Sequence, residues 1–321
     1  SVRAVAALAR GAFTTILVVM KASAPVPIRH HRLKLPQGSL FWHEAGQGSA
    51  VVFLHGTWQD SGQWYPIIEQ LSSDFHCIAP DLLGFGESSA ALAPYSIALE
   101  VESLDALLAR LRVQKVYLVG HALGAWVAFA LAQHYPDRVL GILAIEPEGF
   151  ATPALAGRWK MDRWLVAPWS PLGWLLRCMA PLASRLAAAG QFHRWRHRRQ
   201  RLRHAPAACQ ILFRRRWAEI TAELIGAQPS PLAVPVVVGE FEEATSTARQ
   251  LTQACLDSFP QAKHQIFPTA SISAEEAQAA VTAAVIALTE LADSGVTDNG
   301  VTDNGLDSDP DAASSLLKVR R

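Results

Sequence analysis

The residues whose spacing could support chemistry lie in the pentapeptide GHALG, residues 120–124. It follows the β-branched run 116–119 and precedes an Ala-rich helical stretch. A strand, a sharp turn and a helix in this order, with the pattern G-x-S-x-G at the turn, present a serine nucleophile. Here the third position is Ala122, whose methyl group can neither lose a proton nor form an ester. The pattern predicts the turn without its nucleophile.

The elements that must position this turn alternate along the chain between apolar strands and periodic helices. This alternation predicts a mostly parallel central sheet with helices on both faces. It stops for about eighty residues, and we predict that residues 150–230 form a helical cap inserted between two core parts, 25–149 and 231–291. The expected elements are a hairpin over 31–45, strands over 50–54, 76–80, 116–119, 139–145, 234–238 and 264–267, and helices over 62–72, 97–112, 246–258 and 274–291.

These motifs and their order resemble the α/β-hydrolase superfamily over about residues 35–291. The segments that carry the resemblance are FLHGTWQDSGQW, APDLLGFGES, the GHALG frame, HYPDRV, VPVVVGEFEEA and FPTASISAEEA. HGTW and DLLGFGES look most like lid-bearing members from cyanobacteria and plastids. The resemblance implies the α/β-hydrolase fold with an inserted cap. It also implies an oxyanion frame formed by the backbone N–H of Leu123 and one near Thr57 or Trp58.

The superfamily's triad follows the chain order Ser, Asp or Glu, then His. The resemblance places the acid at Glu242 and the base at Ile272, which has no proton to exchange. His264 lies inside a predicted strand, and we expect it to be an ordinary strand residue. His55 and His121 flank the turn, where the superfamily commonly keeps structural histidines. The triad is therefore degenerate, and no functional catalytic residue is expected.

Loss of both nucleophile and base favours a naturally non-catalytic protein that acts by binding or scaffolding, at a membrane surface or as an accessory subunit of a complex. An engineered trap would change Ser alone and keep the histidine. Two alternatives stay open. One is a lid-bearing ester hydrolase in which Ala122 is a mutated nucleophile and another base acts. The other is a receptor for an apolar small molecule in the retained pocket.

The cap is the most basic part of the chain. It holds fourteen Arg and Lys residues against three acids, whereas the whole chain carries a net charge of +1. Such asymmetry indicates an anionic partner: an anionic membrane, an acidic protein or the chain's own acidic tail. The alternative is a plain lid with tryptophans packed on the core and solvated arginines. The surface residues we expect to bind are Arg194, Arg196, Arg198, Arg199, Trp169 and Trp174.

The ends of the chain and its cysteines provide information on where in the cell the protein is located. The apolar residues 11–20 are too few to span a bilayer, so 1–24 is a packed helix, an interfacial anchor or a targeting remnant. The repeated VTDNG and many aspartates predict a disordered acidic tail over 292–321. Four widely spaced cysteines predict free thiols in a reducing compartment. We expect a cytoplasmic or plastid-stromal protein, peripheral on a membrane, with no cofactor, metal or nucleic-acid partner.

Overall fold

An eight-stranded sheet forms the centre of the molecule. The structure, a computed structural model, describes residues 26–89, 94–152, 158–167, 171, 189–225 and 232–298. The strand order is β1-β2-β4-β3-β5-β6-β7-β8, antiparallel at β1–β2 and β2–β4 and parallel elsewhere. The strands are β1 (Arg29–Leu35), β2 (Gly38–Ala45), β3 (Ser49–Leu54), β4 (Phe75–Pro80), β5 (Val116–His121), β6 (Val139–Ile145), β7 (Val236–Phe241) and β8 (Lys263–Phe267).

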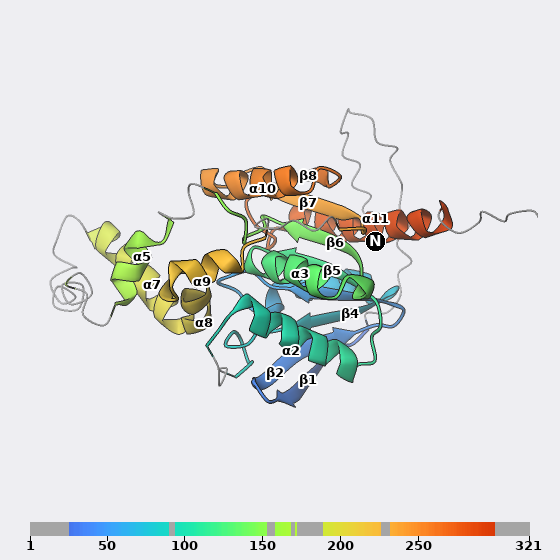
Figure 1. Cartoon of the computed structure of the whole chain (residues 1–321), viewed down its shortest axis with the longest axis horizontal. Helices are drawn as coiled ribbons and strands as arrows, with labels where there is room; N and C mark the ends of the chain where they lie inside the picture. Colours follow the sequence, from blue (N-terminus) through green and yellow to red (C-terminus); the bar gives the residue numbers. More distant parts are fainter. Residues whose placement is uncertain are drawn as a thin grey trace, which may run out of the picture.

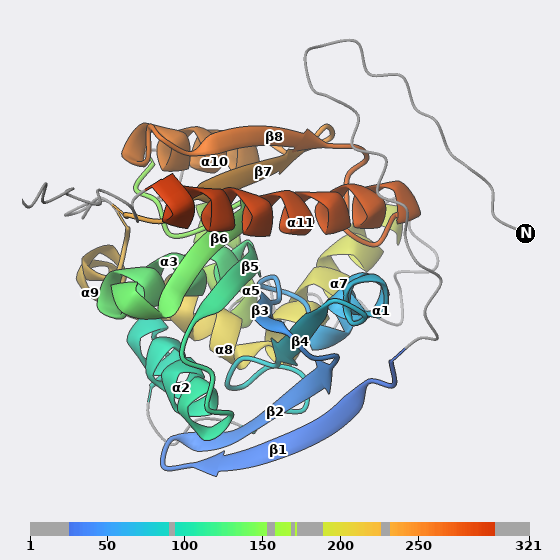
Figure 2. The ribbon, with the colours of Figure 1, turned by 90° about the vertical axis from the view of Figure 1, so that its right-hand side faces the viewer.

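Helices cover both faces of this sheet (Figures 1 and 2). One face packs against α2 (Ile97–Arg110), α3 (Leu123–His134) and α10 (Ser246–Ser258). The other packs against α1 (Tyr65–Leu71) and α11 (Glu275–Asp298). Because side chains alternate along a strand, Val52 of β3 joins the first cluster and Val51 joins the second. The apolar runs read from the sequence are thus central strands buried on both sides, and the predicted fold class is confirmed.

The cap helices stand together at one end of the molecule (Figure 1). They are α5 (Lys160–Val166), α7 (Ala189–His204), α8 (Pro206–Cys209), the π-helical turn η4 (Gln210–Arg214) and α9 (Trp217–Ala222), all between β6 and β7 in the chain. A short parallel bridge between Phe150 and Ile225 holds the two ends of this insertion together. The indole of Trp126 in α3 donates a hydrogen bond to the carbonyl of Glu223, which ties the cap to the core.

The last helix is longer than the sequence indicated. The expected end was residue 291, but α11 continues to Asp298. Two contacts hold this extension: Ala292 is buried, and the hydroxyl of Tyr117 donates to Asp293 Oδ1 at 3.3 Å. The tail prediction was therefore wrong for residues 292–298. The remaining tail, 299–321, and the N-terminal segment, 1–24, lie outside the described residues.

Three of the cysteines, Cys77, Cys209 and Cys255, are buried free thiols. Cys77 lies in β4 and Cys255 in α10, in the elements that we predicted. Burial raises the pKa of the Cys77 thiol to about 12, so it stays protonated.

Within the described part of the chain, no helix combines the length and the apolar character needed to cross a membrane.

Candidate functional site: the elbow and the cap–core cleft

The turn at Ala122 has the strained geometry that the pattern predicts. β5 ends at His121 and α3 begins at Leu123, and between them Ala122 has φ 48° and ψ −108°. A residue other than glycine in such a region carries roughly 1–3 kcal/mol of strain. Backbone hydrogen bonds hold the turn: Ala122 N donates to Ile145 O at 2.9 Å, and Glu148 N donates to Ala122 O at 3.1 Å. We call this turn the elbow.

The two glycines of the elbow are required by close packing. A Cβ on Gly120 would lie 2.5 Å from Ala125 Cα, and one on Gly124 would lie 2.3 Å from Leu54 O. Neither contact is tolerable, so the Gly-X-X-X-Gly spacing lets α3 rest directly on β5 and on the end of β3. The frame of the site is preserved by packing, independently of the residue at position 122.

The expected base position lacks a titratable side chain, whereas the expected acid position keeps a carboxylate. Ile272 is 5% exposed and packs in the apolar cluster on the α11 side of the sheet. Glu242 is exposed, and its backbone N–H donates to Phe267 O at 2.9 Å. His264 is exposed on the edge strand β8, paired with Val238. His264 is the second residue of β8, three residues before the strand ends at Phe267, whereas the expected base position, 272, follows that end.

The two histidines beside the elbow are neutral. His55 is fully buried, and its Nε2 accepts a hydrogen bond from Leu82 N at 3.0 Å. Its Nδ1 therefore carries the proton and donates to Gly56 O at 2.9 Å. Burial lowers the pKa of His121 to about 4, with a smaller contribution from His55. Its ring packs edge-on against Phe241 with centroids 6.4 Å apart. His55 thus has the structural role that we expected.

The buried carboxylate of the site, Glu148, is not among the residues predicted from the sequence. It is 4% exposed, and its Oε2 accepts a hydrogen bond from Thr57 Oγ1 at 2.8 Å. Its Oε1 pairs with Arg158 Nη2 of the cap at 3.0 Å. Thr57, expected near the oxyanion frame, therefore uses its side chain to anchor Glu148. The signal was present in the sequence, since functional residues of α/β sheets follow the carboxyl ends of parallel strands and Glu148 comes soon after β6.

A cleft with a volume of about 620 Å³ lies between the cap and the core. Trp58 of the core meets Trp159 of the cap edge to face, with ring centroids 5.8 Å apart. The described lining does not include Ala122 or Leu123, and Leu123 is completely buried. The cleft is lined by Trp58, Arg158, Trp159, Asp162, Arg194, His197, Arg198, Leu202, Thr245 and Thr247.

The four arginines expected to be solvated divide into two pairs. Arg194 and Arg196 are exposed, as predicted. Arg198 instead binds Asp162 with two hydrogen bonds, of 2.5 and 2.7 Å, and Arg199 Nε donates to Leu165 O at 3.1 Å. The Arg198 side chain is 52% exposed, as expected, but it also neutralises the fully buried Asp162 carboxylate, because a buried charge requires a partner. Arg199 is only partly exposed.

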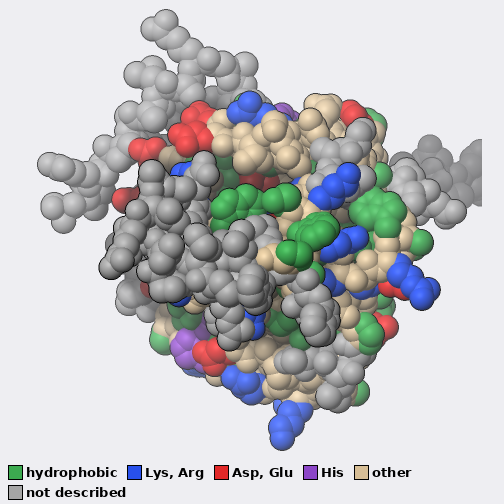
Figure 3. Space-filling view, turned by 90° about the vertical axis from the view of Figure 1, so that its left-hand side faces the viewer, with side chains coloured by type: hydrophobic (Ala, Val, Ile, Leu, Met, Phe, Trp, Pro, Cys, Tyr) green, Lys and Arg blue, Asp and Glu red, His purple; other side chains and the backbone are tan. Residues whose placement is uncertain are grey.

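Exposed aromatic and basic side chains meet on the outer surface of the cap. Trp164 is 58% exposed and Trp217 is 43% exposed, with Met161 beside Trp164 in α5 at 49%. Trp164 and Trp217 share the rim of a hollow of about 430 Å³ with Lys160 and Arg163. Figure 3, which faces the cap end, shows hydrophobic side chains interspersed with Lys and Arg. Trp169 and Trp174, predicted to bind, lie outside the described residues.

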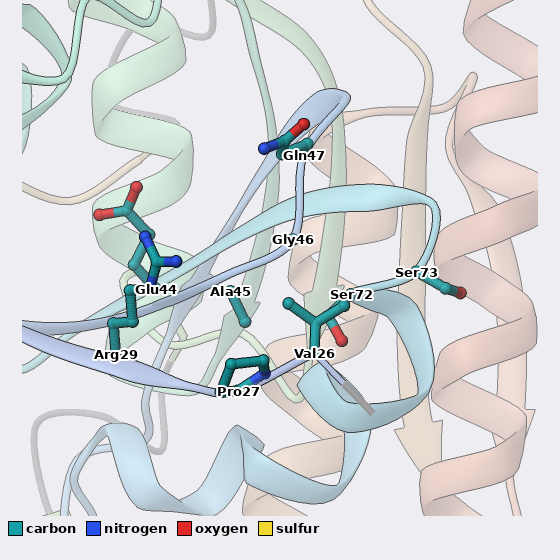
Figure 4. Close-up of a pocket in the computed structure, with 9 residues that line it drawn as sticks. All are labelled: Val26, Pro27, Arg29, Glu44, Ala45, Gly46, Gln47, Ser72 and Ser73. Atoms are coloured by element: carbon teal, nitrogen blue, oxygen red, sulfur yellow. The ribbon is translucent and has the colours of Figure 1, made fainter. Parts of the chain in front are cut away.

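A further hollow of about 310 Å³ lies at the other end of the parallel strands (Figure 4). It is lined by Val26, Pro27, Arg29, Glu44, Ala45, Gly46, Gln47, Ser72 and Ser73. These residues come from the segment that leads into β1, from the end of β2 and the loop before β3, and from the turn after α1, near the amino ends of β3 and β4. Sites on open α/β sheets form at the carboxyl ends, so the elbow end remains the candidate.

The mostly parallel sheet, the strained turn after β5 and the helices inserted after β6 define an α/β protein of the hydrolase type. Residues 49–231 match the family model described as alpha/beta hydrolase fold. The chain belongs to this family.

Relatives with different names match the chain. It is 34% identical over 185 residues to 1-acylglycerol-3-phosphate O-acyltransferase ABHD5 of Rattus norvegicus, covering 54% of this chain and 51% of that protein. It is 36% identical over 131 residues to a haloalkane dehalogenase of Mesorhizobium japonicum, covering 39% and 42%. The chain spans about a third to a half of the length of the curated relatives it matches. An esterase structure from Thermogutta terrifontis superposes with a TM-score of 0.60 at 23% identity, over 82% of this chain and 99% of that one; this likeness shows the fold alone.

Proposed function

We propose that this protein is a catalytically inactive member of its family that acts by binding, with its cap docked on an anionic membrane surface. One observation carries the loss of catalysis: the elbow keeps its strained geometry while presenting the methyl group of Ala122. Ile272, at the base position, is buried among apolar side chains. Of the histidines near the elbow, His55 has both ring nitrogens engaged, by Leu82 N and Gly56 O, and His121 directly precedes Ala122 at the end of β5. His264 lies inside the edge strand β8.

The membrane part of the proposal rests on the outer surface of the cap. Indole rings favour the headgroup level of a bilayer, and basic side chains are attracted to anionic lipid at about 1 kcal/mol per charge. Trp164, Trp217 and Met161 expose apolar surface beside Lys160 and Arg163. One relative is named for acyl transfer to 1-acylglycerol-3-phosphate, an anionic lipid, which supports a lipid surface over an acidic protein. Peripheral attachment on the cytoplasmic or plastid-stromal side stays a prediction.

Release of a chromogenic alcohol from short acyl esters tests the loss of catalysis. We expect no turnover above buffer from the wild-type protein or from Ala122→Ser, because a serine alone has no general base to activate it. The double variant Ala122→Ser/Ile272→His shows whether the missing base can be restored. Turnover by the single variant would contradict the proposal, since it would reveal another base.

Co-sedimentation with phosphatidylcholine vesicles, with and without phosphatidylserine, tests the docking. We expect binding only with phosphatidylserine, and weaker binding as salt rises, because exposed charges are screened over about 8 Å at physiological ionic strength. The double variant Trp164→Ala/Trp217→Ala should bind at least about tenfold more weakly, since burying one aromatic side chain is worth about 1.5–3 kcal/mol.

Ile266→Ala is the matched control, because Ile266 is 60% exposed on β8, away from the cap. It should bind vesicles like the wild type, and thermal melts should show that all three proteins are folded. Equal binding by the wild type and the double Trp variant would contradict membrane docking through this surface. So would capture by an acidic protein with no binding to phosphatidylserine.

A further inference from the structure

We propose that the cap–core cleft binds an organic anion: a phosphate or carboxylate group attached to an aromatic or other flat apolar group. This site is distinct from the outer surface of the cap and does not depend on membrane docking. Its lining combines three arginines and a histidine with two tryptophans (Arg158, Arg194, Arg198, His197, Trp58 and Trp159).

The positive charge of the cleft exceeds its negative charge. Arg198 is neutralised by Asp162, and Arg158 is paired with Glu148. Arg194 has no carboxylate within ion-pair distance among the described residues, and it is exposed to the cleft's solvent. An anion entering the cleft would therefore meet an arginine that needs no existing bond to be broken.

The arrangement of these groups on α7 is regular. Arg194, His197, Arg198 and Leu202 follow the spacing i, i+3, i+4 and i+8 and all line the cleft, so one face of the helix is directed to it. Arg196, on the same helix, is exposed and is not part of the lining. The basic residues of α7 thus fall into two groups: some line the cleft, whereas Arg196 faces away from it.

Two buried donors in the lining lack acceptors. Arg158 uses Nη2 for Glu148, while its Nη1 is buried without a hydrogen-bond partner within the described part of the chain. Among the described residues, Trp159 Nε1 is also buried without a hydrogen-bond partner. Such orphaned donors are uncommon in folded proteins and often indicate a missing ligand or ion.

The opposite wall of the cleft also favours binding of an anion. Thr245 and Thr247 line it at the N-terminus of α10, a helix of thirteen residues, and the Thr245 hydroxyl caps Ala248 N. The first N–H groups of a helix and its dipole favour a negative charge. The N-terminus of α10 therefore favours an anion in the cleft, as Arg194 does.

The aromatic part of the ligand is indicated by the tryptophans. Trp159 stacks on Phe213 with centroids 5.7 Å apart, and the Arg158 guanidinium lies 4.7 Å from the Trp159 ring. Trp58 closes against the same indole. A cleft of about 620 Å³ is within the range of small-molecule sites. The sequence left an apolar ligand open as one alternative, and the charges of the cleft favour an amphipathic anion instead.

Isothermal titration calorimetry without vesicles tests the site, with 1-naphthyl phosphate as the probe. Neutral 1-naphthol and inorganic phosphate are the comparison ligands, because they separate the contributions of the ring and the charge. We expect one molecule of 1-naphthyl phosphate to bind per chain, and both comparison ligands to bind at least about tenfold more weakly, as charge-assisted hydrogen bonds and the ring each contribute.

Arg194→Gln should weaken binding of 1-naphthyl phosphate by about tenfold. Arg196→Gln removes the same charge from the same helix outside the cleft, so its affinity should stay within about twofold of the wild type. Equal losses in the two variants would overturn the proposal, since they would reflect general attraction to the basic cap. Absence of binding by the wild type, or equal affinity for 1-naphthol, would also overturn it.

The variant Trp164→Ala/Trp217→Ala separates this site from the proposed function. It should bind 1-naphthyl phosphate like the wild type, whatever its behaviour on vesicles, because neither tryptophan lines the cleft. If it lost the probe while remaining folded, the ligand would be on the outer surface of the cap, and the cleft assignment would fail.

Discussion

The elbow and the cap lie at the same end of the molecule, but their side chains serve different purposes. At the elbow, apolar packing is complete: Leu123 is fully buried, the two glycines admit no Cβ, and the position of the nucleophile is a methyl group. In the cap, charged and aromatic side chains remain accessible, including Arg194, Trp164 and Trp217. The difference fits the proposal that the elbow serves as a structural frame, while the groups able to recognise another molecule belong to the cap and its cleft.

The largest expected effect separates the structural arginine of the cap from the accessible ones. Arg198→Gln should reduce the free energy of unfolding by about 3–5 kcal/mol, because it leaves the buried Asp162 carboxylate without its partner. Arg194→Gln and Arg196→Gln should change it by no more than about 0.5 kcal/mol, as surface substitutions usually do. Chemical denaturation measures all three.

Adding Asp162→Asn to Arg198→Gln provides the control for that prediction. The double variant should recover part of the lost stability, since no uncompensated charge remains buried. If Arg198→Gln is no more destabilising than Arg196→Gln, the ion pair contributes nothing, and the distinction between the two kinds of arginine fails.

The next effect concerns pH at the elbow. An unfolded His121 takes up a proton near pH 6.5, whereas burial lowers its folded pKa to about 4. Between these values unfolding takes up a proton, so this residue makes the folded state less stable as the pH falls from 6.5 to 4, by roughly 1.4 kcal/mol per pH unit. His121→Gln should remove that part of the slope in denaturation curves recorded from pH 7 to pH 4.

An unchanged slope for His121→Gln would mean that the imidazole beside the elbow is solvated in the native protein, and the elbow would no longer be a packed, neutral region.

The sequence predicted the strands and the elbow better than it predicted the side-chain contacts around them. Strand positions and the elbow followed from apolar runs and local spacing, because burial on both faces of a parallel sheet leaves a continuous apolar signal. Ile272 could be recognised because its place is counted from neighbouring motifs. Glu148 could not be recognised in this way, since its role depends on Thr57 and Arg158, which reach it from a different loop and from the cap.

The roles of the cap arginines could not be predicted from the sequence either. Its basic character was plain from composition, but six arginines in α7 look equivalent in a list. Their roles separate only when Asp162, more than thirty residues earlier, is placed beneath Arg198. The spacing of Arg194, His197, Arg198 and Leu202 on one helical face was available in the sequence. Its meaning required knowledge of which face meets the core.

The smallest expected effect is the change in stability on replacing Ala122 by glycine, and its sign tests whether the elbow is strained. Glycine accepts positive φ freely, so Ala122→Gly should leave stability unchanged or raise it by up to about 1 kcal/mol, given φ 48° at that position. Ala218, exposed in helix α9 of the cap, is the matched control. Ala218→Gly should lower stability, by less than the roughly 0.5–1 kcal/mol of a mid-helix glycine, because Ala218 is the second residue of α9.

Both variants delete the same methyl group and loosen the unfolded chain equally, so opposite signs isolate the backbone conformation as the cause. Thermal and chemical denaturation of the pair under one set of conditions measure the difference. If Ala122→Gly destabilises the protein as much as Ala218→Gly does, the elbow carries no strain. A stabilising effect would show that the turn has a costly backbone conformation at Ala122, and that close packing of α3 on β3 and β5 is what maintains it.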